Sequence, residues 1–219
     1  MIWKVDQGLS IGYKNRPVAT VAEEILFEAG QVTLLLGLNG QGKTTLMKTL
    51  AGLLPPLAGR LARIHMLYLS DEVDFPARLT PIEIVRCLDP GRKYRTLGSE
   101  MLSGLELENK MYGLLSKGNR QKARVVFAEI ISRAREVCFL GIDEPFAGLD
   151  FQARDYLVSR WLENVDRERH LLVSMHPSEI PVAPSQILLI SEGKITTVPP
   201  TTSWPEIRVL LHKPQLISV

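Results

Sequence analysis

The sequence predicts an α/β protein: a mainly parallel β-sheet covered by helices, with an antiparallel β-subdomain at the N-terminus and an inserted helical lobe. Short apolar runs of strand length alternate with helical patterns, which indicates parallel strands joined by crossover helices. A glycine-rich loop separates one such strand from a helix, and a second apolar strand ends in two carboxylates. At 219 residues the chain has the size of one large domain.

The N-terminal third supplies the first strands and the first helix. Residues 2–36 alternate short apolar runs with turn residues such as Gly30, which predicts antiparallel strands. Their last part, Val32–Leu36, is continuously apolar and predicts a buried strand. A helix is expected to follow over residues 44–51, because Gly52 and two prolines then end the helical pattern.

A further strand is predicted at residues 61–70, and the amino-acid composition changes after it. Residues 71–113 are polar and helix-prone but broken by prolines, which predicts a separate helical lobe. A long helix is expected from about Ser116 to Arg135, because apolar residues recur there at helical spacing. Its basic residues are expected to form a solvated face: Arg120, Lys122, Arg124, Arg133 and Arg135.

The C-terminal third predicts two buried strands, at residues 137–142 and 170–175, and a hairpin at residues 187–195. The four prolines after residue 198 predict an irregular tail. We therefore expect a single domain of 219 residues divided as follows: a core of residues 1–70 and 137–198, a helical lobe of about residues 71–135, and a tail of residues 199–219.

The loop after the strand Val32–Leu36 matches the P-loop pattern G-x-x-x-x-G-K-S/T. Its backbone N–H groups and the positive end of the helix dipole would face a phosphate. Lys43 would reach the β- and γ-phosphates of a nucleoside triphosphate, and Thr44 would offer its hydroxyl to Mg²⁺. The expected nucleotide-binding residues of this P-loop NTPase core are Gly37, Leu38, Asn39, Gly40, Gln41, Gly42, Lys43, Thr44 and Thr45.

The apolar strand at residues 137–142 ends in Asp143 and Glu144, just before Pro145. In a P-loop enzyme this is the expected form of the Walker B strand. Asp143 would hold Mg²⁺, directly or through water, and Glu144 would polarise the attacking water as the catalytic base.

A third motif makes a family resemblance specific. Residues 115–122, Leu-Ser-Lys-Gly-Asn-Arg-Gln-Lys, resemble the signature motif LSGGQ of ATP-binding cassette (ABC) proteins. The motif keeps Ser116 and Gly118 but carries Lys117 and Asn119 at its variable places. A serine hydroxyl, backbone N–H groups and a helix dipole together form an anion site.

The resemblance covers about residues 2–198 and implies further roles. Asp150 lies in a segment that resembles the D-loop, and His176 resembles the switch histidine that contacts the γ-phosphate. Tyr13 lies where the family places an aromatic ring that stacks on adenine, although a lone tyrosine can also be a packing residue. Asp71 replaces the glutamine usual in the family; it is either a ligand of Mg²⁺ or a turn residue opening the helical lobe.

The resemblance also implies partners. ABC cassettes act as head-to-tail dimers, so Ser116–Asn119 of one copy would cover the ATP held by Gly37–Thr45 of another, in a homodimer or a heterodimer. We expect an ATPase subunit of an ABC transporter with a separate integral membrane subunit, and Lys117 favours an exporter. The segment 71–81 is the expected contact with that subunit. The alternative is a soluble ABC ATPase in a non-transport role such as iron–sulfur cluster assembly.

Composition and hydropathy argue against nucleic-acid-binding, membrane-spanning and secreted proteins, and against a metal site built from cysteines. A net charge of +2 gives no electrostatic case for a nucleic-acid partner. No apolar run approaches the roughly 18 residues that a membrane helix needs, and the first residues lack a signal-peptide core. The two cysteines have no metal-ligand spacing. We therefore expect a cytoplasmic protein, held at the inner face of the membrane only through its partner.

Overall fold

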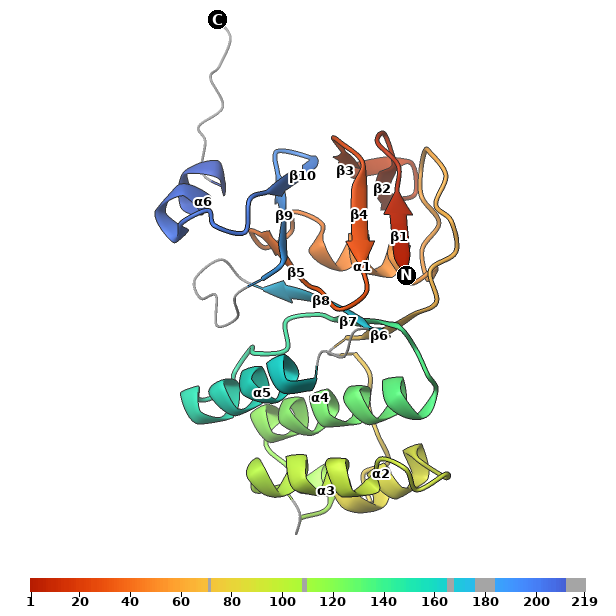
Figure 1. The fold of residues 1–219 in the computed structure, drawn as a ribbon, viewed down its shortest axis with the longest axis vertical. Helices are drawn as coiled ribbons and strands as arrows, with labels where there is room; N and C mark the ends of the chain where they lie inside the picture. Colours follow the sequence, from red (N-terminus) through yellow and green to blue (C-terminus); the bar gives the residue numbers. More distant parts are fainter. Residues whose placement is uncertain (71, 108–109, 165–167, 176–183, 212–219) are drawn as a thin grey trace, which may run out of the picture.

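The computed structural model describes residues 1–70, 72–107, 110–164, 168–175 and 184–211. Figure 1 shows an upper part that holds the strands and α1 (Lys43–Leu50), and a lower part made of helices. The predicted α/β class is confirmed, since a mostly parallel sheet is combined with helices on both of its faces.

The main sheet has eight strands in the order β2-β3-β10-β9-β5-β8-β7-β6. The strands from β9 to β6 run parallel to their neighbours, whereas the pairs β2–β3 and β9–β10 are antiparallel. The strand bounds are β2 (Ser10–Tyr13), β3 (Arg16–Val21), β5 (Val32–Gly37), β6 (Met66–Leu69), β7 (Phe139–Ile142), β8 (His170–Met175), β9 (Gln186–Ser191) and β10 (Lys194–Val198).

A second, two-stranded sheet pairs β1 (Ile2–Val5) with β4 (Ile25–Glu28) in antiparallel fashion. Together with the β2–β3 hairpin it confirms the antiparallel strands predicted before the P-loop. Apolar side chains of β1 and β4 share one core with α1 and with the main sheet, where Phe27 of β4 packs edge-on against Phe139 of β7.

Side chains of β5 alternate between two hydrophobic cores, as the period of a strand requires. Leu34 and Leu36 belong to the core shared with the helical lobe, and Leu35 belongs to the core shared with α1. All six residues of β5 are buried, which explains why this strand is a continuous apolar run. The loop that follows β5 is therefore attached to a strand that is buried along its whole length.

The lower part of Figure 1 contains the helical lobe together with α5. Its first helix begins where Thr80 and Glu83 form a reciprocal capping box and Pro81 occupies the first helical position. The long helix begins directly after Ser116, as predicted. The bounds are α2 (Pro81–Leu88), α3 (Arg95–Gly104), the 3-10 turn η1 (Tyr112–Leu114), α4 (Lys117–Ala134) and α5 (Phe151–Asn164).

The basic residues of α4 do not form a solvated face, so that expectation was wrong for three of them. Lys122, Arg124 and Arg133 keep only 13%, 12% and 14% of their side-chain exposure. Each pairs with a carboxylate on another segment or on its own helix: Asp150, Asp74 and Glu129, respectively. Helical spacing placed these cations on the outside of α4, but neighbouring segments cover that outside.

The C-terminal end of α4 is held by a buried ion cluster. Glu129 accepts hydrogen bonds from Arg133 at 2.5 Å and from Arg169 at 2.8 Å. Arg169 also donates to the hydroxyl of Ser132 at 2.8 Å. Because Arg169 directly precedes β8, the cluster fixes α4 to the start of a central strand.

The region after residue 198 is not irregular throughout, in contrast to the prediction. Residues Trp204–Leu211 form α6, and Ile207 and Leu211 are buried in the main core. Ser191 at the end of β9 donates a hydrogen bond to the carbonyl of Leu210, which ties α6 to the sheet. Pro205 lies in the first turn of this helix, where a proline is tolerated because its N–H would have no intrahelical partner.

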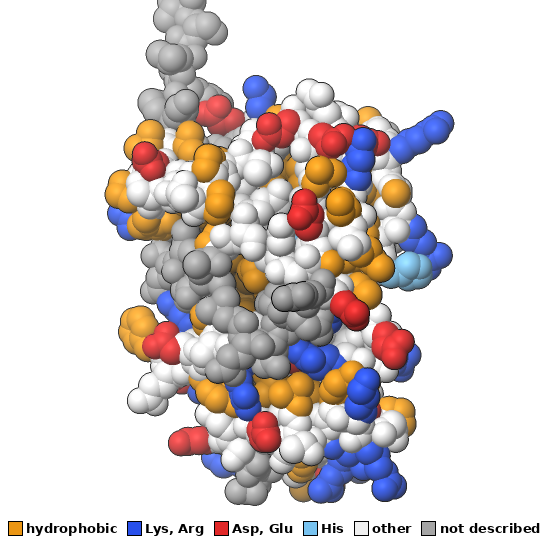
Figure 2. Space-filling view, in the orientation of Figure 1, with side chains coloured by type: hydrophobic (Ala, Val, Ile, Leu, Met, Phe, Trp, Pro, Cys, Tyr) orange, Lys and Arg blue, Asp and Glu red, His pale blue; other side chains and the backbone are white. Residues whose placement is uncertain are grey.

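Acidic and basic side chains are interspersed over both parts of the molecule on the face shown in Figure 2. This mixing agrees with the small net charge of +2. None of the helices in the described ranges is both long and apolar enough to cross a bilayer.

His170, the first residue of β8, is fully buried in an aromatic cluster with Trp3, Phe27 and Phe139. Its Nδ1 lies 2.7 Å from the carbonyl oxygen of Glu28, so the neutral ring donates its N–H there. Burial lowers the pKa of His170 to about 4, against a smaller opposing effect of that hydrogen bond.

We predict that stability falls as the pH is lowered from about 7 to 5. The unfolded chain protonates His170 below its ordinary pKa of 6.5, whereas the folded chain keeps it neutral down to about 4. This difference lowers the free energy of unfolding by about 2 kcal/mol at pH 5 relative to pH 7. Urea unfolding at both pH values should show that His170→Phe removes most of the decline. His65→Phe, at an exposed histidine, is the control; an undiminished decline in His170→Phe would contradict the assignment.

Candidate functional site

The P-loop joins the end of β5 to the start of α1. Gly42 caps α1 with a φ of 110°, a left-handed conformation that glycine adopts without steric cost. A Cβ atom there would lie 2.6 Å from Cγ1 of Val18 in β3. Glycine is therefore required both by the backbone turn and by the close approach of the β2–β3 hairpin.

Lys43 is the first residue of α1, and its side chain is only 5% exposed. Its ammonium donates to the carbonyl of Gly37 at 2.9 Å and lies 3.4 Å from Oε1 of Glu144. A buried cation at a helix N-terminus, beside a turn rich in backbone N–H groups, is suited to an anionic ligand. The P-loop residues thus fit the phosphates of a nucleotide.

The carboxylate of Asp143 accepts hydrogen bonds from three separate segments of the chain. Its Oδ2 accepts hydrogen bonds from the hydroxyls of Thr44 at 2.6 Å and Tyr68 at 3.0 Å. Its Oδ1 accepts a hydrogen bond from the hydroxyl of Ser174. Two of the three residues predicted to hold Mg²⁺, Thr44 and Asp143, are therefore brought together, and their oxygens are the donors that a hard cation such as Mg²⁺ prefers.

Glu144 adopts a left-handed backbone with a φ of 45°. Its N–H donates to the hydroxyl of Ser174 at 3.0 Å, and its carbonyl accepts from Nε2 of Gln121 at 3.4 Å. The carboxylate itself is 43% exposed and faces the ammonium of Lys43. A fixed backbone therefore presents a solvent-accessible carboxylate beside the predicted phosphate site.

The predicted signature residues form the start of α4. The hydroxyl of Ser116 accepts the N–H of Asn119 at 3.2 Å, which is an ordinary N-cap. Lys117 is exposed, whereas Gly118 packs against the D-loop, since a Cβ there would lie 3.0 Å from the carbonyl oxygen of Gly148. A side chain at residue 118 would therefore require the carbonyl of Gly148 to shift by a few tenths of an ångström.

Asp150 links the D-loop to α4. Its carboxylate accepts the N–H of Ala153 at 2.8 Å, which caps α5, and pairs with Lys122 at 2.7 Å. The hydrogen bond from Lys122, together with that from Ala153, holds the pKa of Asp150 below its ordinary value. Lys122 lies one turn beyond the signature, so these contacts connect the signature helix to the segment that follows Glu144.

The three other predicted site residues are Tyr13, Asp71 and His176. Tyr13 ends β2 and is 45% exposed, so its side chain is partly open to solvent. Its stacking on adenine stays a prediction. Asp71 and His176 lie outside the described residues.

Four residues near the site were not assigned a role from the sequence: Tyr68, Gln121, Lys122 and Ser174. A signal existed for Ser174, because it is the one hydroxyl in an otherwise apolar buried run, Leu171–Met175. The other three are surface or strand-end residues by pattern, and only the packing of separate segments brings them to Asp143, Glu144 and Asp150.

A comparison with family models matches residues 24–147 to the family described as "ABC transporter". The match spans the P-loop, the signature and the Walker B strand, more than half of the chain. The chain belongs to the ABC transporter family.

Curated relatives of this ABC protein include the aliphatic sulfonates import ATP-binding protein SsuB of Escherichia coli, with 32% identity over 76% of this chain and 69% of the relative. The SkfA peptide export ATP-binding protein SkfE of Bacillus subtilis shares 30% identity over 86% and 85%. A solved structure titled "Structure of ATP binding subunit of ABC transporter" has a TM-score of 0.76 and 23% identity, with 95% of this chain and 99% of that chain covered. The chain is thus the ATP-binding, ATP-hydrolysing subunit of an ABC transporter.

Proposed function

We propose that the chain hydrolyses ATP through Glu144 and drives a separate membrane subunit by ATP-dependent closure of a dimer. The observation that carries the proposal is the approach of the P-loop and the Walker B strand: Lys43 lies 3.4 Å from Glu144, and Thr44 lies 2.6 Å from Asp143. A phosphate cradle and a general base are thereby side by side.

In the proposed reaction, Lys43 turns from Glu144 toward the β- and γ-phosphates when ATP binds. Glu144, released from that ion pair, accepts a proton from a water molecule as the water oxygen bonds to the γ-phosphorus. The bond from the γ-phosphorus to the β–γ bridging oxygen breaks, which gives ADP and inorganic phosphate. The partly exposed carboxylate of Glu144 is placed to reach such a water.

Thr44 and Asp143 are the described residues that would hold Mg²⁺, and Asp71 is proposed as a third. When bound, Mg²⁺ neutralises charge on the β- and γ-phosphate oxygens. Asp71 follows β6 by two residues, and β6 supplies Tyr68 to Asp143. Asp71 lies three residues after Tyr68 in the sequence.

The proposed dimer places Ser116–Asn119 of one copy over the ATP bound to the P-loop of its partner. Within each copy, Lys122 and Gln121 connect that signature to Asp150 and to the backbone of Glu144. Contact between the signature and the partner's nucleotide would therefore be transmitted to Glu144, the proposed catalytic base of the same chain.

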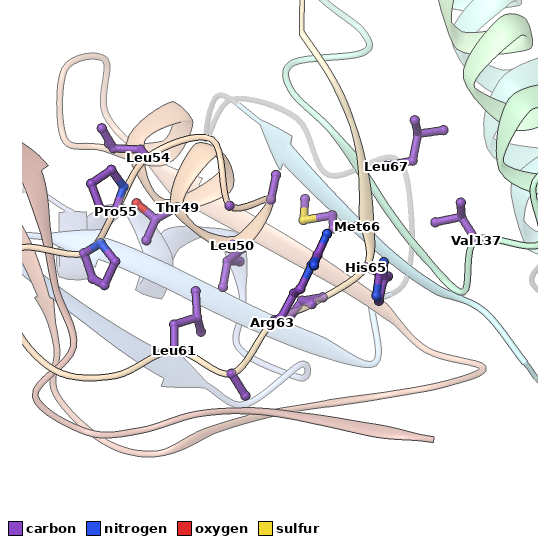
Figure 3. A pocket seen from close by; sticks show the side chains of 15 residues that line it. Thr49, Leu50, Leu54, Pro55, Leu61, Arg63, His65, Met66, Leu67 and Val137 are labelled. Carbon is purple, nitrogen blue, oxygen red and sulfur yellow. The ribbon is translucent and has the colours of Figure 1, made fainter.

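A groove at the far end of α1 is the proposed contact with the membrane subunit. Its volume is about 620 Å³, and its lining is mainly aliphatic, with Leu54 and Pro55 at one end and Leu67 and Val137 at the other (Figure 3). Arg63 adds a cationic side chain, and among the described lining residues no acidic side chain opposes it. Such a surface suits an amphipathic segment with an acidic residue.

The groove is connected to the nucleotide site through α1. Lys48 pairs with Glu72 at 3.2 Å, and the next residues of α1, Thr49 and Leu50, line the groove. Glu72 belongs to the segment expected to contact the membrane subunit. The membrane location of the protein, through this partner, is part of the proposal.

Most of the relatives whose names give a direction are import proteins, such as SsuB, whereas SkfE is named for export. The exporter expected from Lys117 therefore has no independent support. A non-transport role is disfavoured, because both of these relatives are named as transport proteins.

Glu144→Gln should keep ATP binding but lower turnover by at least about 100-fold, because an amide cannot accept the proton of the attacking water. The variant should also accumulate as an ATP-bound dimer, detected by size-exclusion chromatography with ATP and Mg²⁺. Glu72→Gln, at an exposed glutamate, is the control. Turnover within a few-fold of wild type would show that the assigned base is wrong.

Asp71→Ala should raise the Mg²⁺ concentration needed for half-maximal ATPase activity several-fold and barely change nucleotide affinity. Asp71→Gln should restore much of the activity, because its amide oxygen can occupy the same place. If Asp71 is only a turn residue, Asp71→Ala instead lowers the melting temperature and leaves the Mg²⁺ titration unchanged. Asp74→Ala, at a nearby exposed aspartate, is the control.

Leu54→Asp should leave the ATPase activity of the isolated chain within twofold of wild type and abolish its co-purification with the membrane subunit of its transporter. A charge in the aliphatic groove would have to be buried unpaired on docking. Val209→Asp, at an exposed residue of α6, is the matched control. Intact co-purification of Leu54→Asp would place the contact elsewhere.

A further inference from the structure

Strand β8 carries one serine directly beside the catalytic end of β7. The parallel register pairs Ile142 with Val173, so the next residues of the two strands are Asp143 and Ser174. Ser174 is fully buried, and the residues on either side of it in β8 are apolar. A hydroxyl in such a strand needs hydrogen-bond partners to offset its burial.

Both partners of the Ser174 hydroxyl belong to the Walker B segment. The hydroxyl donates to Oδ1 of Asp143 and accepts the N–H of Glu144 at 3.0 Å. One oxygen atom therefore contacts the side chain of the proposed metal ligand and the backbone of the proposed base. It uses its single donor and one of its two acceptor positions to do so.

The bond to Asp143 matters most when nucleotide is bound. In the structure Oδ2 of Asp143 is held by Thr44 and Tyr68. Thr44 is needed for Mg²⁺ in the loaded site, where its hydroxyl would no longer be reserved for Asp143. Ser174 on Oδ1 and Tyr68 on Oδ2 would then keep the carboxylate in place.

The bond to Glu144 matters because its backbone is strained. A φ of 45° is unfavourable for a residue with a side chain and persists where surrounding contacts enforce it. The backbone of Glu144 donates its N–H to Ser174, and its carbonyl accepts from the N–H of Ala147 at 3.2 Å and from Gln121 at 3.4 Å. The direction of the Glu144 side chain depends on that backbone conformation.

We propose that Ser174 is a positioning residue for ATP hydrolysis, whose hydroxyl fixes the orientation of Asp143 and Glu144 relative to each other. The inference rests on the proposed roles of these two carboxylates. It assigns to β8 a share in both metal binding and proton transfer.

The competing explanation is that Ser174 only satisfies buried polar groups. Ser132 on α4 provides a matched control, because it is also fully buried and its hydroxyl also donates once and accepts once, to Glu129 and from Arg169. Ser132→Ala removes an equivalent hydroxyl from the cluster at the far end of α4.

The experiment compares Ser174→Ala, Ser174→Thr and Ser132→Ala. Affinity for a fluorescent ATP analogue is measured in EDTA and across a Mg²⁺ titration, together with steady-state ATPase activity and melting temperature. Ser174→Ala should raise the Mg²⁺ concentration for half-maximal enhancement of binding about tenfold and lower kcat about tenfold or more. Its affinity in EDTA should stay within twofold, Ser174→Thr should retain most of both properties, and Ser132→Ala should lower only the melting temperature.

A Mg²⁺ dependence and kcat within twofold of wild type in Ser174→Ala would overturn the inference, as would the same changes in Ser132→Ala. Glu144→Gln, measured in parallel, separates this failure from a failure of the proposed function. Wild-type turnover in Glu144→Gln would contradict the proposed function. Lost turnover in Glu144→Gln, together with a wild-type Mg²⁺ dependence and kcat in Ser174→Ala, would contradict only the role of Ser174.

Discussion

The hydroxyl hydrogen bonds received by Asp143 hold together segments that are far apart in the chain, and the functional site depends on them. Thr44, Tyr68 and Ser174 lie 99, 75 and 31 residues away from Asp143. Asp143 is 9% exposed, and an ionised carboxylate in that position is costly unless donors surround it. A shift of α1, β6 or β8 relative to β7 would remove one of those donors. The placement of these elements is therefore constrained by a single side chain.

The parallel arrangement of the central strands makes this convergence possible. In the order β5-β8-β7-β6 every neighbouring pair is parallel, so all four strands end on one edge of the sheet. The P-loop, Ser174, the Walker B carboxylates and the segment after Leu69 all lie at or just beyond those ends. Burial of the strands on both faces fixes their register, because a one-residue slip would exchange the two hydrophobic cores.

The sequence predicted features that local chemistry determines. The P-loop turn requires Gly42, and an apolar strand precedes this turn. Ser116 caps α4, which begins at Lys117. The roles of Ser174 and Lys122 could not be predicted in the same way, because they depend on the strand register and on the packing of α4 against the D-loop. Helical periodicity shows that a lysine points outward from its helix, but not which other segment lies there. For the same reason α6 was missed, since its short apolar stripe becomes informative only beside β9.

The ion cluster of Glu129, Arg133 and Arg169 gives α4 the character of a rigid lever. At one end the helix is bonded to the D-loop through Lys122, and at the other end the cluster clamps it to the base of β8. Rotation of the helix about its axis, or a slide by one turn, would separate buried opposite charges, which is strongly unfavourable. A force on the signature end of α4 is therefore not relieved by sliding of the helix. It is instead passed along the helix to the start of β8.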